Sequence, residues 1–297
     1  MHIPDGFLST PVWAALDVAA APATVYLARR AQSGFDESRA PLLGVMGAFV
    51  FAAQMINFPV GAGTSGHLVG GALLACTLGP AAASVVMTAI LAIQALVFQD
   101  GGILALGANV LNMAVLGVLA GYLPYHLWGP RKAALFLGGT LSVLVGALLA
   151  VSQLLISGIP MPAPVLGVSL GLFVVSALLE GGITLAVFQA LESINPKFVS
   201  QPRAGGGKAL GAVALAALLL AVAGVLFASA NPDGLERLAE NLGIASRAQT
   251  LIPAPLADYE AGFLTAEWPR KAAAGLAGLV LIYGACWLLG RMVKRSA

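Results

Sequence analysis

The sequence predicts an all-α integral membrane protein. Of its 297 residues, 59% are hydrophobic and 9% are charged, whereas a soluble domain carries about a quarter charged residues. So few charges cannot cover a water-facing surface, and lipid must therefore be the main solvent. Apolar stretches of about 20 residues, the length that crosses the bilayer as a helix, recur along the whole chain. The 36 glycines suit close contact between membrane helices.

Nine helices account for the apolar stretches. The third is too short to cross the bilayer unaided, so we expect a half-helix or a tilted piece joined to the fourth at Gly79-Pro80. No cleavable signal peptide is expected, because no positively charged region precedes the first apolar stretch. The expected ranges are 10–28, 41–58, 67–79, 80–98, 103–121, 133–156, 166–192, 209–229 and 272–290.

Basic residues assign the two sides of the membrane. Eleven of the fifteen lysines and arginines fall on one side if all nine ranges cross, and the positive-inside rule makes that side cytoplasmic. We therefore expect a multi-pass protein of the cytoplasmic (inner) membrane, with its N-terminus outside and its C-terminus in the cytoplasm. The external loops before the linker contain one charge, Asp100. The eleven residues are Arg29, Arg30, Arg39, Arg131, Lys132, Lys197, Arg203, Lys208, Arg291, Lys294 and Arg295.

A polar segment rich in Gly and Pro divides the chain into two units. An external loop separates the two helices of the second unit. The loop begins with NPDGLERLAENLG, which predicts a short amphipathic helix capped by Asn231 or Asp233. The expected parts are a first unit at 1–200, a cytoplasmic linker at 201–208, a second unit at 209–297 and, within it, the external loop at 231–271.

Two glycine-rich stretches resemble nucleotide-binding motifs without meeting their requirements. GAGTSG at 61–66 lies between two apolar helices, not in the strand-turn-helix unit of a dinucleotide site. GGGK at 205–208 has Pro202 and Ala209 where a Walker A motif needs Gly and Ser or Thr. We therefore expect no ATPase in this chain. The net charge of +2 does not indicate a nucleic-acid partner, and the two cysteines lie too far apart to suggest a disulfide framework.

The chain has three histidines, and two of them are expected on the external side. The α-amine of Met1, the amide nitrogen of His2 and the His2 imidazole Nδ1 can bind one metal ion through two fused chelate rings. The imidazole of His67 can then complete a square of four nitrogens, which suits Ni(II), Cu(II) or low-spin Co(II). Each histidine alone has a plainer explanation: chance for His2, and a hydrogen bond at a helix start for His67. His126 is expected in a cytoplasmic loop with an interfacial role.

Several other polar residues lie within or beside the predicted helices. Asn109 and Asn112 share a helix face and either bond to another helix or support the N-terminal loop. Ser65 precedes His67 in the same turn and is a candidate support for the ligands. Asp17 and Glu180 are carboxylates within the membrane, where unpaired charges are costly, so we expect them to pair inside the bundle.

Small residues spaced four apart mark one face of each of the first two helices. Such stripes let another helix approach closely, either inside the chain or in a partner subunit of the membrane. The stripes are Ala15, Ala19 and Ala23 on the first helix, and Gly44, Ala48 and Ala52 on the second.

Separated motifs resemble a known family. The stretches are MHIPDG at 1–6, NFPV at 57–60 running into GTSGHLVGG at 63–71, DGG at 100–102 and GANVLNM at 107–113. Together they resemble the substrate-capture (S) component of energy-coupling factor nickel/cobalt transporters, the NikM/CbiM group. Residues from 209 onward, with PDGLE at 232–236, resemble the small NikN-like accessory component, so the chain resembles an M–N fusion (NikMN).

The resemblance implies a fold, a ligand set and partners. The fold is a six-helix S-component bundle with an extra N-terminal helix, followed by a two-helix accessory unit with an external loop. The metal ligands are the Met1 α-amine, the His2 amide and imidazole nitrogens, and the His67 imidazole. The partners are a transmembrane coupling subunit (Q-type) and cytoplasmic ATPases (O-type), with docking through Gly44, Ala48 and Ala52.

The sequence therefore predicts high-affinity uptake of Ni(II) or Co(II) by a component that catalyses no bond chemistry and holds no cofactor besides its cargo. Nickel is favoured because of the planar nitrogen set and the fused second unit. The alternatives are a cobalt-specific uptake component for cobalamin synthesis, a stand-alone metal channel or carrier, and an intramembrane metalloenzyme. An enzyme needs an open coordination position and a base, and Asp5 is the one carboxylate close in sequence to the candidate ligands.

Overall fold

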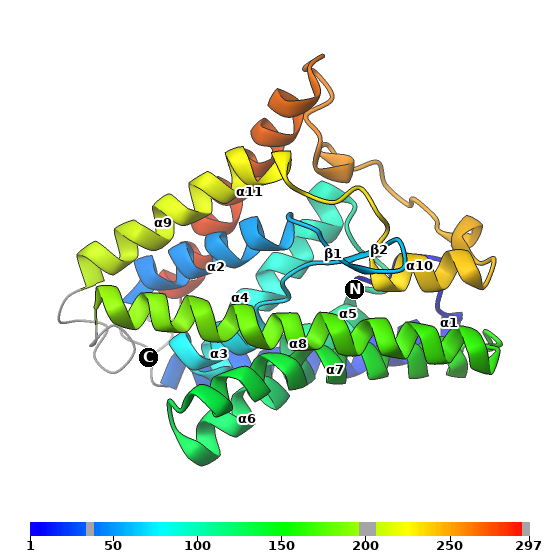
Figure 1. Ribbon diagram of the computed structural model, residues 1–297, viewed down its shortest axis with the longest axis horizontal. Helices are drawn as coiled ribbons and strands as arrows, with labels where there is room; N and C mark the ends of the chain where they lie inside the picture. Colours follow the sequence, from blue (N-terminus) through cyan, green and yellow to red (C-terminus); the bar gives the residue numbers. More distant parts are fainter. Residues whose placement is uncertain (34–38, 196–205, 293–297) are drawn as a thin grey trace.

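The computed structural model describes residues 1–33, 39–195 and 206–292, and its elements are almost all helices (Figure 1). A π-helical stretch, Gln94–Phe98, continues α4, and another, Val110–Gly117, joins α5 to α6. The elements are α1 (Thr10–Ser33), α2 (Ala40–Gln54), β1 (Phe58–Gly61), β2 (Thr64–Gly66), α3 (Gly71–Leu78), α4 (Pro80–Ile93), α5 (Leu106–Asn109), α6 (Val118–Trp128), α7 (Lys132–Ile156), α8 (Ala163–Ile194), α9 (Gly206–Ala223), α10 (Gly234–Asn241) and α11 (Glu267–Met292).

Seven helices in the described part of the chain are long and apolar enough to cross a membrane. This confirms the predicted class of a helical, multi-pass membrane protein. Two of the nine expected helices are shorter: α2 has 15 residues and α3 has 8, against the roughly 20 that a span needs. The seven ranges are Thr10–Ser33, Pro80–Phe98, Leu106–Trp128, Lys132–Ile156, Ala163–Ile194, Gly207–Leu226 and Glu267–Arg291. The expected linker at 201–208 lies mostly outside the described residues.

A short hairpin, which the sequence analysis missed, follows α2. The expected helix at 41–58 ends at Gln54, and Pro59 disfavours helical backbone at Phe58, the residue before it. Antiparallel β1 and β2 then pair Phe58 with Gly66 and Pro59 with Ser65. The turn between them has positive φ angles at Gly61, Ala62 and Gly63, a conformation that favours glycine. The hairpin ends directly before His67.

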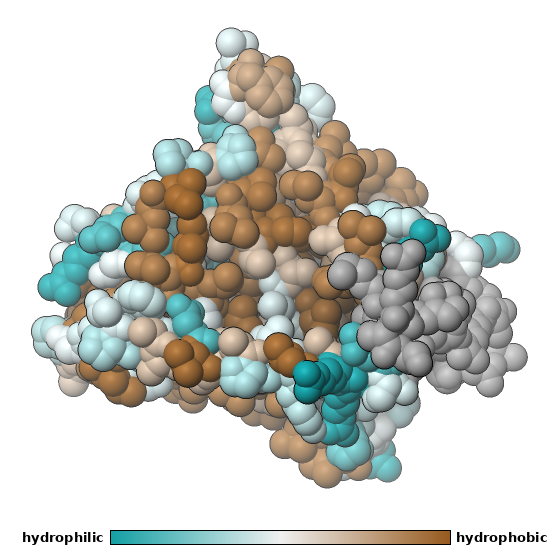
Figure 2. Space-filling view, turned by 180° about the vertical axis from the view of Figure 1, so that it is seen from behind, coloured by the Kyte–Doolittle hydropathy of each residue, from teal (hydrophilic) through white to brown (hydrophobic). Residues whose placement is uncertain are grey.

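The helices form two groups that diverge from the end carrying the C-terminus (Figure 1). One group contains α2, α9 and α11, which pack on one another; the other contains α7 and α8, with α6 packed on α7. The hairpin and α10 lie in the angle between the groups, and the N-terminus lies beside them (Figure 1). Hydrophobic residues cover much of the molecular face shown in Figure 2, and hydrophilic residues gather toward its edges.

The stripe predicted to dock a partner subunit on the second helix is buried inside this chain. Gly44, Ala48 and Ala52 of α2 are all buried, and a Cβ atom on Gly44 would lie 2.7 Å from the ring of Tyr283 in α11. The small residues let α11 approach α2 closely, which is the internal-packing alternative. This corrects the docking prediction for α2. The corresponding stripe of α1 is more open, since Ala15 and Ala19 are exposed.

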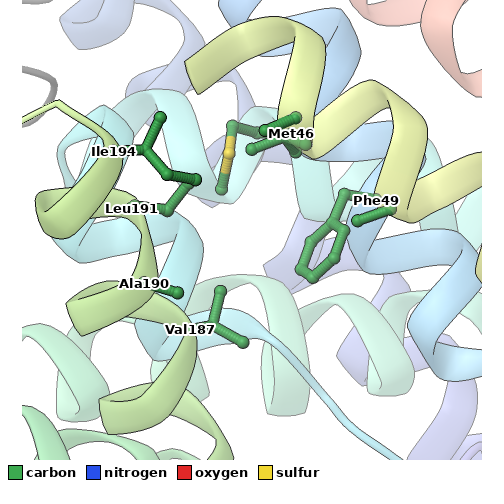
Figure 3. Close-up of a pocket in the computed structure, with 9 residues that line it drawn as sticks. Met46, Phe49, Val187, Ala190, Leu191 and Ile194 are labelled. Atoms are coloured by element: carbon green, nitrogen blue, oxygen red, sulfur yellow. The ribbon is translucent and has the colours of Figure 1, made fainter. Parts of the chain in front are cut away.

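An apolar pocket of about 170 Å³ lies between α2, α8 and α9 (Figure 3). These three helices supply side chains that carry no charge and no hydrogen-bonding group apart from the thioether of Met46. Such a lining suits a surface that faces hydrocarbon. The labelled residues are Met46, Phe49, Val187, Ala190, Leu191 and Ile194.

Candidate metal centre

The backbone around His67 is fixed by a carboxylate from α8. Both oxygens of Glu180 accept hydrogen bonds of 2.8 Å, from the backbone N–H groups of Val69 and Gly70. Glu180 is fully buried, so these bonds satisfy the carboxylate as well as the start of α3. Glu180 was expected to pair inside the bundle. In the structure its partners are the backbone N–H groups of Val69 and Gly70.

The ring of His67 presents one nitrogen without a proton. Its Nδ1 lies 3.0 Å from the carbonyl oxygen of Leu68. A carbonyl oxygen only accepts, so Nδ1 is the donor and the neutral ring keeps the lone pair on Nε2. Burial, followed by the nearby Met1 amine and His2, lowers the pKa of His67 to about 4. The ring is therefore neutral at neutral pH and can act as a ligand.

The N-terminal segment folds back onto the loop before α5. Asn109 clamps the backbone of Ile3, because its Oδ1 accepts from the Ile3 N–H at 2.8 Å and its Nδ2 donates to the Ile3 carbonyl at 3.0 Å. The N–H of Gly102 donates to the same carbonyl at 2.9 Å. Asn109 thus supports the N-terminal loop, as one of the two sequence alternatives proposed.

Asp5 provides a second anchor for this segment. Its buried carboxylate accepts from three consecutive backbone N–H groups, those of Ile103, Leu104 and Ala105, at 2.8 to 3.1 Å. A carboxylate with three such bonds is committed to holding the loop. The geometry therefore gives Asp5 the structural task of holding this loop.

These anchors bring the α-amine of Met1 next to His67. The amine nitrogen lies 2.9 Å from Nε2 of His67 and 2.5 Å from Oδ2 of Asp233. Two nitrogen ligands at right angles around a metal, with bonds of about 2.0 Å, lie about 2.8 Å apart. The separation between the amine and the imidazole is thus close to that required for adjacent ligands of one ion.

His2 is buried beside His67, and its ring faces a carboxylate. The two ring planes are parallel within 2°, with centroids 5.7 Å apart. Nδ1 of His2 lies 2.9 Å from Oδ1 of Asp100, and its buried Nε2 has no hydrogen-bond partner among the residues that the structure describes. Since Nδ1 is the nitrogen that the predicted chelate would use, it has to exchange Asp100 for the metal when the chelate closes.

Asp233, from the second unit, completes the surroundings of the amine. Its Oδ1 caps α10 by accepting from the N–H groups of Leu235 and Glu236 at 2.8 Å, which confirms the predicted helix start. Its Oδ2 bonds the amine and lies 3.8 Å from Nε2 of His67. Burial alone would raise the pKa of Asp233, but the positively charged amine and His67 lower it to about 2. Asp233 is therefore ionised at neutral pH.

Ser65 attaches the second unit to the hairpin. The Ser65 N–H donates to the carbonyl of Pro232 at 2.8 Å, and its hydroxyl donates to the carbonyl of Asn231 at 2.7 Å. The predicted support by Ser65 thus acts on the segment that carries Asp233.

The remaining candidates lie away from the amine. Asn112 and Gln153 exchange two hydrogen bonds of 2.7 and 2.8 Å between helices, which is the interhelical alternative. Asp17 accepts from the N–H of Gly107 at 2.8 Å and so holds the start of α5. His126 lies not in a loop but in the last turn of α6, because the helix continues to Trp128.

Two cavities border the candidate ligands His2 and His67. One, of about 410 Å³, is lined by His67, Asp100, Asp233, Glu236 and Tyr259 among others. The other, of about 530 Å³, includes His2 and shares the three carboxylates. Ionised carboxylates attract cations, so these cavities suit the approach of a metal ion. Among the described residues, no group of three or more His, Cys, Asp or Glu side chains has the geometry of a metal site.

The sequence matches two family models in succession. Residues 2–198 match CbiM, described as a cobalt uptake substrate-specific transmembrane region. Residues 207–295 match the PDGLE domain.

Similar proteins and structures carry related descriptions. A putative fused nickel transport protein NikMN of Archaeoglobus fulgidus is 35% identical over 309 residues and covers 100% of both chains. A cobalt transport protein CbiM of Nostoc sp. is 32% identical, covering 66% of this chain and 80% of the relative. A crystal structure of a transition metal transporter matches with a TM-score of 0.60 and 33% identity, over 68% of this chain and 100% of the other.

Proposed function

Since the chain belongs to the cobalt uptake substrate-specific transmembrane (CbiM) family, we propose that it captures Ni(II) outside the cytoplasmic membrane for uptake by an energy-coupling factor transporter. The family assignment and the PDGLE match agree with the resemblance to an M–N fusion drawn from the sequence. The chain is thus a component of a transition-metal transporter. High affinity, the choice of nickel and the energy source are parts of the proposal.

The observation that carries the proposal is the 2.9 Å separation between the Met1 amine and Nε2 of His67. In this structure the ammonium group of Met1 donates to the bare Nε2 of His67. An incoming ion would take the place of that shared proton and bind both nitrogens. The amide and Nδ1 of His2 would complete the square, which requires residue 1 to keep an unblocked amine.

Nickel is proposed over cobalt because four nitrogens in a plane, one of them a deprotonated amide, suit Ni(II) particularly well. Asp100 and Asp233 supply negative charge beside the ion without having to coordinate it. The relative that matches the whole chain is described as a nickel transport protein, whereas a relative described as a cobalt transport protein matches over 66% of this chain.

Transport is proposed to need a membrane coupling subunit and cytoplasmic ATPases. The N-terminus, the hairpin and α10 lie together, away from the end of the bundle that carries the C-terminus (Figure 1). We place the first end outside the cell and the second in the cytoplasm, as the basic residues indicate. A stand-alone carrier would work without these partners.

The test is nickel binding and uptake by the full chain with a native N-terminus. Calorimetry should show one Ni(II) per chain, and the visible spectrum of the complex should be that of planar, four-nitrogen Ni(II). Uptake of radioactive nickel into cells should depend on co-expression of the coupling subunit and ATPases. Absence of nickel binding would refute the proposal, and uptake by this chain alone would favour the carrier alternative.

Nickel binding is also expected to release about two protons per ion at neutral pH, because amine and amide ligands bind metals in deprotonated form. His67 should release none, since its pKa is about 4 and its Nε2 is already bare. Protonation should remove His67 from the ligand set only as the pH falls toward 4. Calorimetry in buffers of different ionisation enthalpy measures the proton count, and a count near zero would contradict the chelate.

Replacing Asn109 by alanine should weaken nickel binding by about 10- to 100-fold, the usual effect of removing a group that orients a ligand. The substitution frees the backbone of Ile3 and so loosens the amine and His2. Asn112→Ala is the matched control, because Asn112 bonds to Gln153 instead. Competition with a coloured chelator gives both affinities, and equal losses in the two variants would mean that Asn109 acts only through general stability.

A further inference from the structure

Tyr259 connects the second unit to the residue that holds His2. It lies in the loop between α9 and α11, and its hydroxyl donates to Oδ2 of Asp100 at 2.5 Å. The other oxygen of Asp100 faces Nδ1 of His2. Each carboxylate oxygen therefore has a different partner, one from the second unit and one from the N-terminal segment, and this fixes the plane of the carboxylate.

The position of the Tyr259 hydroxyl is itself determined by several contacts. Nε2 of Gln94 donates to the hydroxyl oxygen at 3.0 Å, which leaves the hydroxyl proton for Asp100. The Tyr259 ring stacks on Phe98, with centroids 4.8 Å apart. The N–H of Leu256 donates to the carbonyl of Val97 at 2.9 Å and so attaches the same segment to the π-helical stretch that follows α4.

The backbone at this point adopts an unfavourable conformation. Asp258 and Tyr259 have φ angles of 55° and 57°, in the left-handed region that residues with a Cβ atom rarely occupy. Two such residues in succession persist only where the surroundings hold them. At Tyr259 the result of this conformation is a phenol directed at Asp100. Burial and the Asp100 charge raise the pKa of Tyr259 well above its usual value, so the phenol remains a donor at neutral pH.

We propose that Tyr259 is a positioning residue for the metal ligands, acting through Asp100 on the imidazole of His2. Its hydrogen bond fixes the Asp100 carboxylate and takes up part of the Asp100 charge. The first effect keeps the His2 ring near the amine and His67. The second weakens the hold of Asp100 on Nδ1, which has to be freed for the chelate. Both effects favour metal binding, so the second unit strengthens the metal site when it is seated on the first.

This inference rests on the proposed function, and a double-mutant cycle with Ni(II) as the probe tests it separately. Tyr259→Phe keeps the ring on Phe98 and loses the hydroxyl. In the full chain with a native N-terminus it should weaken nickel binding about tenfold, as expected for a lost hydrogen bond to a charged group. In an Asp100→Asn background the same substitution should change the affinity less than about twofold, because the charged partner is gone.

Tyr283→Phe is the control, since Tyr283 lies in α11 and packs against Gly44, away from Asp100. If Tyr259→Phe does not fold, Gln94→Met replaces it in the cycle, because it removes the donor that orients the hydroxyl. An unchanged affinity in the folded Tyr259 variant, or an equal loss with and without Asp100→Asn, would overturn the positioning role and leave the proposed function intact. Failure of the unmodified chain to bind nickel would overturn both.

Discussion

A retained N-terminal tag or an acetyl group on Met1 is expected to abolish measurable nickel binding. Either change converts the amine into an amide, which removes one ligand and displaces the group that now bonds to His67 and Asp233. Four-ligand structural zinc sites contribute about 10–16 kcal/mol, so one ligand in four is worth about 2.5–4 kcal/mol, or roughly a hundredfold to several hundredfold in affinity. Loss of the fused chelate should add to this figure.

The measurement compares one protein before and after removal of a cleavable N-terminal tag whose protease leaves Met1 as the first residue. Calorimetry should show no binding before cleavage and full binding after it. The same tag at the C-terminus is the control for effects on folding and on detergent behaviour. Equal affinity in the cleaved and uncleaved proteins would reject the chelate and move the site elsewhere.

The candidate ligands could be read from the sequence because three of the four nitrogens are contiguous. The Met1 amine, the His2 amide and the His2 ring belong to two adjacent residues, so no knowledge of the fold was needed to see the chelate. Asn109 was found for a similar reason, since a polar side chain in an apolar helix requires a partner. For Asn112 the same argument offered an interhelical hydrogen bond as one alternative but did not identify Gln153 as its partner.

The groups around the ligands could not be derived in the same way. Asp233 and Tyr259 reach the site from a loop more than 160 residues after His67, and their contacts depend on how the two units pack. Partial signals were present: Asp100 was the one charge in three expected external loops, and Asp233 was a candidate helix cap. Pro59 and the glycines after it also indicated that the helix at 41–58 should end early.

The buried stripe of α2 shows the limit of arguments from small residues. Spacing alone identified a face suited to close helix contact, and the contact exists, but its partner is α11 of the same chain. A fused second unit changes which faces remain open to a coupling subunit. The spacing of small residues therefore predicts that a helix face makes a close contact. Which helix makes that contact depends on the topology of the chain.

The second large effect is expected for His67→Ala. The substitution removes the one ligand that the N-terminal segment cannot supply, so the remaining three nitrogens would have to recruit water as the fourth. By the same arithmetic as for the amine, nickel affinity should fall by roughly a hundredfold to several hundredfold. The amine would keep its ion pair with Asp233, so the N-terminal segment should stay in place and the protein should remain folded.

His126→Ala is the matched control, because His126 is exposed near the end of α6 and shares no contact with the amine. Its nickel affinity should equal that of the unmodified chain. Melting temperatures of both variants separate loss of a ligand from loss of structure. A spectrum unchanged from the planar four-nitrogen form in His67→Ala, or equal losses of affinity in the two variants, would show that the imidazole of His67 is not a ligand. In that case the role of Nε2 of His67 would be only to accept the hydrogen bond from the Met1 ammonium group.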